Sequence, residues 1–248
     1  SQLEKNIKGF DYGTQYTEAI DSASLSSAVS NGLTKSNRLQ EFFDARKVGP
    51  GIWKWKHYFD IYDRHFSKFI NRDVNVLEIG IFSGGSLDMW QDYFGEKCHI
   101  YGVDIAEACK AFENEKVTVH IGDQEDRRFW NRVKNEIPKI DVLIDDGGHS
   151  SGQQIATFEE MLPHMRPGGI YVCEDVVNVN NGFNSYCQGL TKGLNDIRYV
   201  DPSLGHKGGI QPNDLQAWIK GIYFYPYMVV IEKAEEPLTK LIAPKHGT

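Results

Sequence analysis

The stretch that most constrains the fold spans residues 140–175, where two short apolar runs each end in acidic residues. The runs lie at 140–144 and 170–173, and a glycine-rich turn follows the first of them. Runs with this ending are typical of central parallel strands, whose carboxyl ends meet at the ligand-binding edge of an open α/β sheet. The polar side chains at the two ends belong to Asp145, Asp146, His149, Glu174 and Asp175.

The acids at these strand ends predict a metal site formed by Asp146, Glu174 and Asp175, with His149 beside it. A cluster of carboxylates is electrostatically unfavourable unless a cation or a proton offsets its charge. An all-oxygen donor set favours a hard cation such as Mg²⁺, Mn²⁺ or Ca²⁺ over zinc. Two simpler interpretations stay open, because an Asp-Gly cluster is often only a turn and a histidine often serves packing.

A strand, a glycine turn and a helix open the predicted domain. The strand is expected at residues 74–79 and the helix at 87–94, as in a nucleotide-binding βαβ unit. Gly80 and Gly84 let the backbone approach a ligand closely, but the turn lacks the GxGxxG spacing of dinucleotide-binding folds. The acid Glu78 disfavours a pyrophosphate, so the expected ligand is cationic or zwitterionic.

The next two strand candidates end in groups suited to an adenosine. Residues 98–103 end at Asp104, which is placed to accept hydrogen bonds from both hydroxyls of a ribose. Residues 117–121 end at Gly122 and Asp123, where the edge of an adenine could be recognised.

The chain is interpreted as an appended arm, residues 1–51, followed by one α/β domain, residues 52–248. The arm is polar, with weak helical patterns at 17–29 and 37–46, and is expected to be a lid over the site or an oligomer contact. A partly disordered tail is the alternative, because apolar residues are few there.

Two further segments carry candidate substrate contacts. The aromatic stretch at 53–66 predicts a core helix with Tyr58, Tyr62 and Phe66 on one face. Residues 176–217 are rich in Asn and Gly and are interpreted as a substrate lid with a helix near 186–196, before a hairpin of strands at 221–225 and 227–232. The candidate substrate contacts in these segments are His57, Tyr58 and His206.

Composition narrows the class of protein and of partner. The 248 residues fit one large α/β domain with additions. A net charge of −7, with scattered basic residues, argues against nucleic acid as a partner. The four cysteines form no CxxC pair and no apolar run is long enough to cross a bilayer. We therefore expect a soluble, cytoplasmic protein with no membrane partner.

The order of these elements resembles the class I S-adenosylmethionine-dependent methyltransferase fold over residues 74–233. The resemblance rests on the Glu-x-Gly-x-x-x-Gly turn from Glu78, on Asp104, on the Gly-Asp pair ending at Asp123, on a Pro-Gly-Gly turn at 167–169 and on the final hairpin. It implies a Rossmann-like α/β sheet of seven strands with helices on both faces and an N-terminal helical arm.

Within that class, the Asp-Asp-Gly-Gly-His turn at 145–149, the Glu-Asp pair at 174–175 and the hairpin closely resemble the metal-dependent sugar O-methyltransferases of macrolide biosynthesis, the macrocin and mycinamicin type. Their upstream Lys-Trp, His-x-Tyr and Tyr-x-x-His-Phe elements are similar to residues 54–55, 57–58 and 62–66.

This resemblance implies roles for individual residues. Mg²⁺, with Mn²⁺ as the alternative, would be bound by Asp146, Glu174 and Asp175, and His149 would be the general base beside a catalytic Asp146. S-adenosylmethionine would be held by a larger set. These cofactor residues are Glu78, Gly80, Gly84, Ser86, Asp104, Asp123 and Asp145.

The predicted function is S-adenosylmethionine- and Mg²⁺-dependent O-methylation of a sugar hydroxyl in a glycosylated natural product. The expected partners are a small-molecule glycoside and, from the resemblance, further copies of the chain in a homo-oligomer. Three alternatives stay open: O-methylation of a non-sugar hydroxyl on a catechol or polyketide, a dinucleotide-dependent oxidoreductase, and a non-catalytic binding domain.

Overall fold

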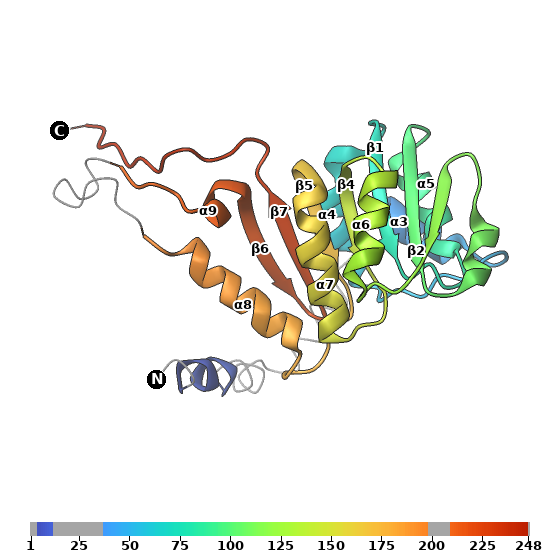
Figure 1. Ribbon diagram of the computed structural model, residues 1–248, viewed down its shortest axis with the longest axis horizontal. Helices are drawn as coiled ribbons and strands as arrows, with labels where there is room; N and C mark the ends of the chain where they lie inside the picture. Colours follow the sequence, from blue (N-terminus) through green and yellow to red (C-terminus); the bar gives the residue numbers. More distant parts are fainter. Residues whose placement is uncertain (1–3, 12–36, 198–208, 248) are drawn as a thin grey trace, which may run out of the picture. The chain divides into compact units, whose positions relative to one another are not determined.

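The computed structural model describes residues 4–11, 37–197 and 209–247, and Figure 1 shows their helices and strands. The helical pattern predicted at 17–29 and the candidate substrate contact His206 lie outside these residues. Within them, no helix is both long enough and apolar enough to span a bilayer.

The chain divides into two compact units, Ser1–Asn37 and Arg38–Thr248. The division falls before helix α3 (Arg38–Ala45), whereas composition placed the boundary at residue 51. The physical reason is Leu39 of α3, which is fully buried in the core of the second unit. In the first unit, residues 4–11 are helical.

In the described part of the second unit, seven strands form one sheet in the order β3-β2-β1-β4-β5-β7-β6 (Figure 1). The strands are β1 (Val74–Ile79), β2 (Cys98–Asp104), β3 (Val117–Ile121), β4 (Ile140–Asp145), β5 (Met165–Cys173), β6 (Ile219–Tyr225) and β7 (Met228–Lys233). β1 to β5 run parallel, and β7 lies antiparallel between β5 and β6. The predicted α/β sheet and its closing hairpin are confirmed.

Helices cover both faces of this sheet (Figure 1). One face carries α3, α4 (Tyr58–Phe66) and α5 (Gly85–Phe94), and the other carries α6 (Arg127–Glu136), α7 (Ser151–Met161) and α8 (Gly182–Leu194). Every residue of β1 and β4 is buried, which explains why these strands are near-continuous apolar runs. The shorter helical elements are η1 (Ser67–Phe69), η2 (Glu107–Phe112), η3 (Leu162–His164) and α9 (Asp214–Trp218).

The aromatic stretch forms the predicted core helix. Tyr58, Tyr62 and Phe66 of α4 are all fully buried. The ring of Tyr62 stacks on Phe66, with ring centroids 5.6 Å apart, and meets the edge of Trp90 on α5 at 5.1 Å. These contacts fix α4 against α5, and the segment that precedes α4 lines the same cavity as the carboxyl end of β1.

Helix α8 occupies much of the segment that was predicted to be a lid. It begins at Gly182, and its residues Phe183 and Cys187 are fully buried in the core. That part of residues 176–217 therefore belongs to the helical layer on the sheet. Residues 198–208, which complete the predicted lid, lie outside the described part of the chain.

Candidate active site

A cavity of about 550 Å³ opens at the carboxyl ends of β1 to β5. The turns after these strands and residues 51–55, which precede α4, line it. This is the position at which an open α/β sheet binds its ligands. Asp146, His149, Glu174 and Asp175, predicted from the sequence, are among the residues that line the cavity.

The glycine turn after β1 brings two strand ends together at Gly80. Its φ is +87°, and a Cβ atom there would lie only 2.0 Å from the carbonyl oxygen of Asp146. The backbone N–H of Asp146 donates to the carbonyl of Ile79 at 3.0 Å. Glycine alone fits this approach without strain, and the turn is thereby held against the acid that follows β4.

Four of the predicted cofactor residues line the cavity, namely Gly80, Ser86, Asp104 and Asp123. The carboxylate of Asp104 accepts hydrogen bonds from the backbone N–H groups of Phe82 at 3.0 Å and Ala106 at 2.8 Å. These bonds orient the carboxylate at the end of β2, where a ribose would need an acceptor.

The other three predicted cofactor residues, Glu78, Gly84 and Asp145, are not among the described residues that line the cavity. Glu78 is fully buried and accepts hydrogen bonds from Ser86 Oγ at 2.9 Å and Trp90 Nε1 at 3.0 Å. Gly84 precedes α5 with φ +79°. The structure places these residues as supports of the turns and not in contact with the cavity.

Asp145 supports the turn after β4 from beneath. It is 1% exposed and accepts a hydrogen bond from Gln124 Nε2 at 3.0 Å. Burial raises the pKa of Asp145 to about 7, against the opposing effect of its hydrogen bonds. Gln124 also accepts a bond from the Gly148 N–H at 2.7 Å, which ties the end of β3 to the turn that carries His149.

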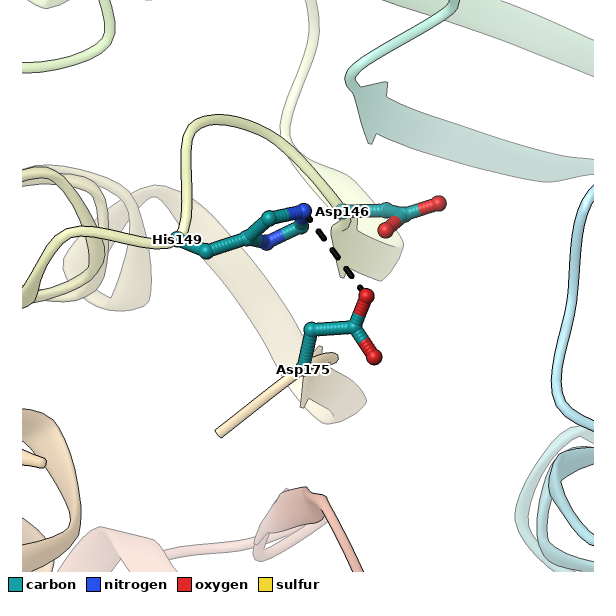
Figure 2. Close-up of side chains that lie close together, drawn as sticks. All are labelled: Asp146, His149 and Asp175. Carbon is teal, nitrogen blue, oxygen red and sulfur yellow. Dashed lines mark ion pairs between the residues drawn. The ribbon is translucent and has the colours of Figure 1, made fainter. Parts of the chain in front are cut away.

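Asp146, His149 and Asp175 meet at one place in the cavity, and Figure 2 shows the imidazole beside both carboxylates. Each offers one ligand atom, and these atoms lie within 4.8 Å of one another. His149 Nε2 is 3.7 Å from Asp175 Oδ2. The three residues therefore form a candidate cation site of two carboxylates and an imidazole.

Glu174, the third predicted metal ligand, is paired with a lysine. Lys54 Nζ donates to both oxygens of Glu174 at 3.0 Å, and the Tyr62 hydroxyl donates to Oε1 at 2.5 Å. Lys54 Nζ also lies 2.6 Å from Asp146 Oδ2. Burial and the neighbouring Asp146 raise the pKa of Glu174, whereas Lys54 and Tyr62 oppose that rise.

Asp175 is oriented by the segment that precedes α4 and by the first residue of α4. Trp55 Nε1 donates to Asp175 Oδ1 at 3.0 Å, and the Tyr58 hydroxyl lies 2.9 Å from the same oxygen. The Tyr58 hydroxyl also accepts a hydrogen bond from the backbone N–H of Asp175 at 3.2 Å. These contacts leave Oδ2 directed toward His149.

Three non-glycine residues that line the cavity have left-handed backbone conformations. The φ values are +48° for Phe82, +59° for His149 and +50° for Asp175. Such conformations cost roughly 1–3 kcal/mol each and persist where the surrounding structure enforces them, often at functional sites. Two of the three residues, His149 and Asp175, belong to the candidate cation site.

Comparisons with known proteins find a methyltransferase domain in this chain and sugar O-methyltransferases among its relatives. Residues 77–176 match a methyltransferase domain. Demethylmacrocin O-methyltransferase of Streptomyces fradiae is 32% identical over 90% of this chain and 62% of its own length. Mycinamicin VI 2''-O-methyltransferase of Micromonospora griseorubida is 33% identical over 75% of this chain and 49% of its own length.

A solved structure agrees with these relatives. The MycE methyltransferase of the mycinamycin biosynthetic pathway, in complex with Mg and SAH, is 27% identical with a TM-score of 0.64, over 81% of this chain and 55% of that chain. The chain thus contains a methyltransferase domain and has the class I methyltransferase fold. It spans 49% to 62% of the lengths of the two curated relatives. The predicted resemblance and fold are confirmed.

The candidate substrate contacts His57 and Tyr58 hold a turn. His57 Nε2 lies 3.0 Å from the Pro226 carbonyl, and the Tyr58 hydroxyl lies 3.0 Å from the Tyr227 carbonyl. Both residues therefore fasten α4 to the turn between β6 and β7. Neither is among the described residues that line the cavity.

The sequence interpretation assigned no role to Lys54 and Trp55, although both contact the acid cluster, which consists of Asp146, Glu174 and Asp175. Lys54 reaches two of its acids and Trp55 reaches a third. One signal was available for the lysine, because clustered carboxylates require a cation and the chain itself can supply it. The indole of Trp55 left no such signal, since aromatic residues upstream of a core helix usually join the core.

Proposed function

We propose that this methyltransferase transfers the methyl group of S-adenosylmethionine to a sugar hydroxyl of a glycosylated natural product, with Mg²⁺ bound at the acid cluster. The observation that carries this proposal is one cavity that joins Asp104 and Asp123 to Asp146, His149 and Asp175. The proposal is supported by the names of the relatives, which are O-methyltransferases of demethylmacrocin and mycinamicin VI, and by the Mg and SAH in the MycE complex.

The residues at the acid cluster fit a hard divalent cation. Asp146 Oδ2 accepts a hydrogen bond from Lys54, and Asp175 Oδ1 is hydrogen-bonded to Trp55 and Tyr58. Within the described residues, Oδ1 of Asp146 and Oδ2 of Asp175 accept no hydrogen bond. Asp146 Oδ1 and Asp175 Oδ2 are therefore available to Mg²⁺, which binds few protein oxygens and keeps places for water or substrate hydroxyls.

The remainder of the cavity suits the cofactor. Asp104 would accept hydrogen bonds from the ribose hydroxyls, and Asp123 would contact the adenine. Gly80 also lines the cavity and would lie beside the amino acid part of the cofactor. Glu78 stabilises this turn through Ser86 and Trp90.

His149 would be the general base. When bound, the cofactor would supply an electrophilic methyl group, and the cation would lower the pKa of the acceptor hydroxyl. His149 would take the hydroxyl proton at Nε2, and Asp175 Oδ2, 3.7 Å away, would stabilise the imidazolium that forms. Binding the acceptor beside the methyl group replaces a bimolecular encounter with an oriented one.

Two variants test this assignment. His149→Gln should lower turnover on a glycoside substrate by about 10²-fold or more, with calorimetric binding of S-adenosylmethionine unchanged. Asp104→Asn should weaken cofactor binding by about tenfold or more, because one partner of charge-assisted hydrogen bonds is lost. A His149→Gln enzyme with wild-type turnover would refute the base, and a folded wild-type protein that binds no cofactor would refute the proposal.

The choice of acceptor needs a separate experiment. A panel of glycosides and their aglycones, assayed with and without a chelator, separates sugar methylation from methylation of a catechol or polyketide hydroxyl. Activity on aglycones alone would favour the second function. Assembly into a homo-oligomer and a cytoplasmic location also stay predictions, and sedimentation of the purified protein tests the first of them.

A further inference from the structure

The ammonium group of Lys54 is enclosed by the acid cluster. Its side chain is only 2% exposed, and Nζ lies 2.6 Å from Asp146 Oδ2, 3.0 Å from both Glu174 oxygens and 3.9 Å from Glu78 Oε1. A buried lysine without partners would be strongly destabilising. Here three carboxylates surround the positive charge of Lys54, so the side chain is held in place in the site.

The electrostatic setting keeps Lys54 charged. Burial alone disfavours the ammonium form, but Lys54 Nζ lies within 3.0 Å of carboxylate oxygens of both Glu174 and Asp146, which stabilise its charge. Tyr62 strengthens the arrangement by donating to the same Glu174 oxygen that Lys54 contacts. Lys54 and a metal ion bound at Asp146 would therefore be two cations that interact with the same carboxylates.

We propose that Lys54 is an internal counter-cation that shares Asp146 and Glu174 with the divalent cation and thereby weakens the binding of that ion. The inference rests on the proposed function, which places the ion at this cluster. Lys54 occupies Asp146 Oδ2 and both oxygens of Glu174, and its charge repels a second cation a few ångströms away.

This arrangement has a consequence for the protein without metal. Because Lys54 offsets part of the negative charge of Asp146 and Glu174, the cluster is stabilised before any ion binds. The ion then depends more on Asp146 Oδ1, Asp175 Oδ2 and groups outside the protein, such as water or substrate hydroxyls. Lys54 is in this sense a positioning residue that sets metal affinity without being a ligand.

The test is calorimetric titration with Mn²⁺ as the probe, in the absence of substrate. Lys54→Met should bind Mn²⁺ at least about tenfold more tightly than the wild type, because a repelling charge is removed and Glu174 is released. Lys54→Arg keeps the charge and should stay within about threefold of the wild type. The matched control is Lys56→Met. The exposed side chain of Lys56 forms an ion pair with Asp44, with Nζ 3.5 Å from Oδ1, and does not contact the acid cluster.

The outcomes separate the two proposals. A wild-type protein that binds no Mn²⁺ would refute the metal site of the proposed function. Measurable wild-type binding with equal or weaker binding by Lys54→Met would overturn the inference alone. If Lys54→Met unfolds in chelator, its thermal melt with Mn²⁺ decides. A folded variant in Mn²⁺ supports the inference, because the ion then replaces the lysine charge. A variant that stays unfolded in Mn²⁺ contradicts it.

Discussion

The carboxylate of Asp175 uses its two oxygens differently, and this division determines what it can offer a ligand. Oδ1 contacts the Trp55 indole N–H and the Tyr58 hydroxyl, while Oδ2 points toward His149. Trp55 is half-exposed, and its ring packs against Tyr227 at a centroid distance of 5.5 Å. Its role at the site is therefore separable into a hydrogen bond and a ring contact.

Trp55→Phe should keep the ring contact and lose the hydrogen bond. Without that bond the Asp175 carboxylate is less well oriented, so we expect Mn²⁺ affinity to fall about threefold to tenfold. Calorimetric titration measures the change. Trp53→Phe is the control, because Trp53 also lines the cavity but is 89% exposed. Equal Mn²⁺ affinity of Trp55→Phe and the wild type would show that Tyr58 alone orients Asp175.

Gly80→Ala should be strongly destabilising. The new Cβ atom would lie 2.0 Å from backbone of the turn after β4, at a φ of +87°. We expect the free energy of unfolding to fall by about 2 kcal/mol or more. Gly189→Ala on α8 is the opposite case, since nothing lies within 4 Å and alanine favours a helix by up to about 1 kcal/mol. Urea unfolding should give the two variants opposite signs, and equal signs would contradict the argument.

The acids of the site were predictable because each stands at the end of a short, mostly apolar run. Lys54 was not predictable in the same way, since it lies 92 residues from Asp146 in the sequence and only the folded chain brings the two side chains together. Glu78 shows a second limit. Its place in β1 is evident from the sequence, but its contact with Trp90 on α5 depends on how the helix packs on the strand.

At the scale of elements, β5 shows where sequence patterns mislead. The apolar run suggested a strand from residue 170, yet β5 begins at Met165 and passes through the Pro-Gly-Gly segment. The pairing with β4 shifts register between Ile140 and Val142, and Gly168 has φ +75°. A strand can absorb such a segment as a bulge, whereas the residue types alone indicate a turn.

The contact between α4 and β6 predicts a pH effect on stability. His65 of α4 lies with Nε2 2.9 Å from the Tyr225 hydroxyl, and its ring centroid is 4.9 Å from that of Tyr223. Burial lowers the pKa of His65, so the folded state disfavours the charged imidazole. The unfolded chain therefore binds more protons below about pH 6.5, and this contribution to stability is lost as the pH falls.

Urea unfolding at pH 7.5 and pH 5.5 measures this effect. The wild type should lose more stability between these pH values than His65→Gln, in which the titrating group is absent. His246→Gln, on the exposed tail, is the control and should match the wild type. A His65→Gln variant with the wild-type pH dependence would exclude His65 as a source of the effect.

At the scale of the whole chain, the sheet with its cavity and the described N-terminal helix belong to different units. All strands of the described sheet and all residues that line the cavity belong to Arg38–Thr248. Composition suggested that the arm extends to residue 51, because residues 38–51 are polar on average. That average concealed Leu39 and the ion pairs of Arg38 with Asp92 at 3.1 Å and Arg46 with Asp88 at 2.7 Å.

Two truncations therefore distinguish the boundary in the structure from the boundary expected from composition. A chain that begins at Arg38 retains α3 and the whole cavity, so its melting temperature and its S-adenosylmethionine affinity should match those of the full chain. A chain that begins at residue 52 loses the fully buried Leu39, a loss of about 2–5 kcal/mol for side chains of this kind, and Gly51 from the cavity wall. Its melting temperature should fall by about 5 °C or more. Equal melting temperatures for the two truncated chains, measured by calorimetry, would show that α3 is not part of the folding unit.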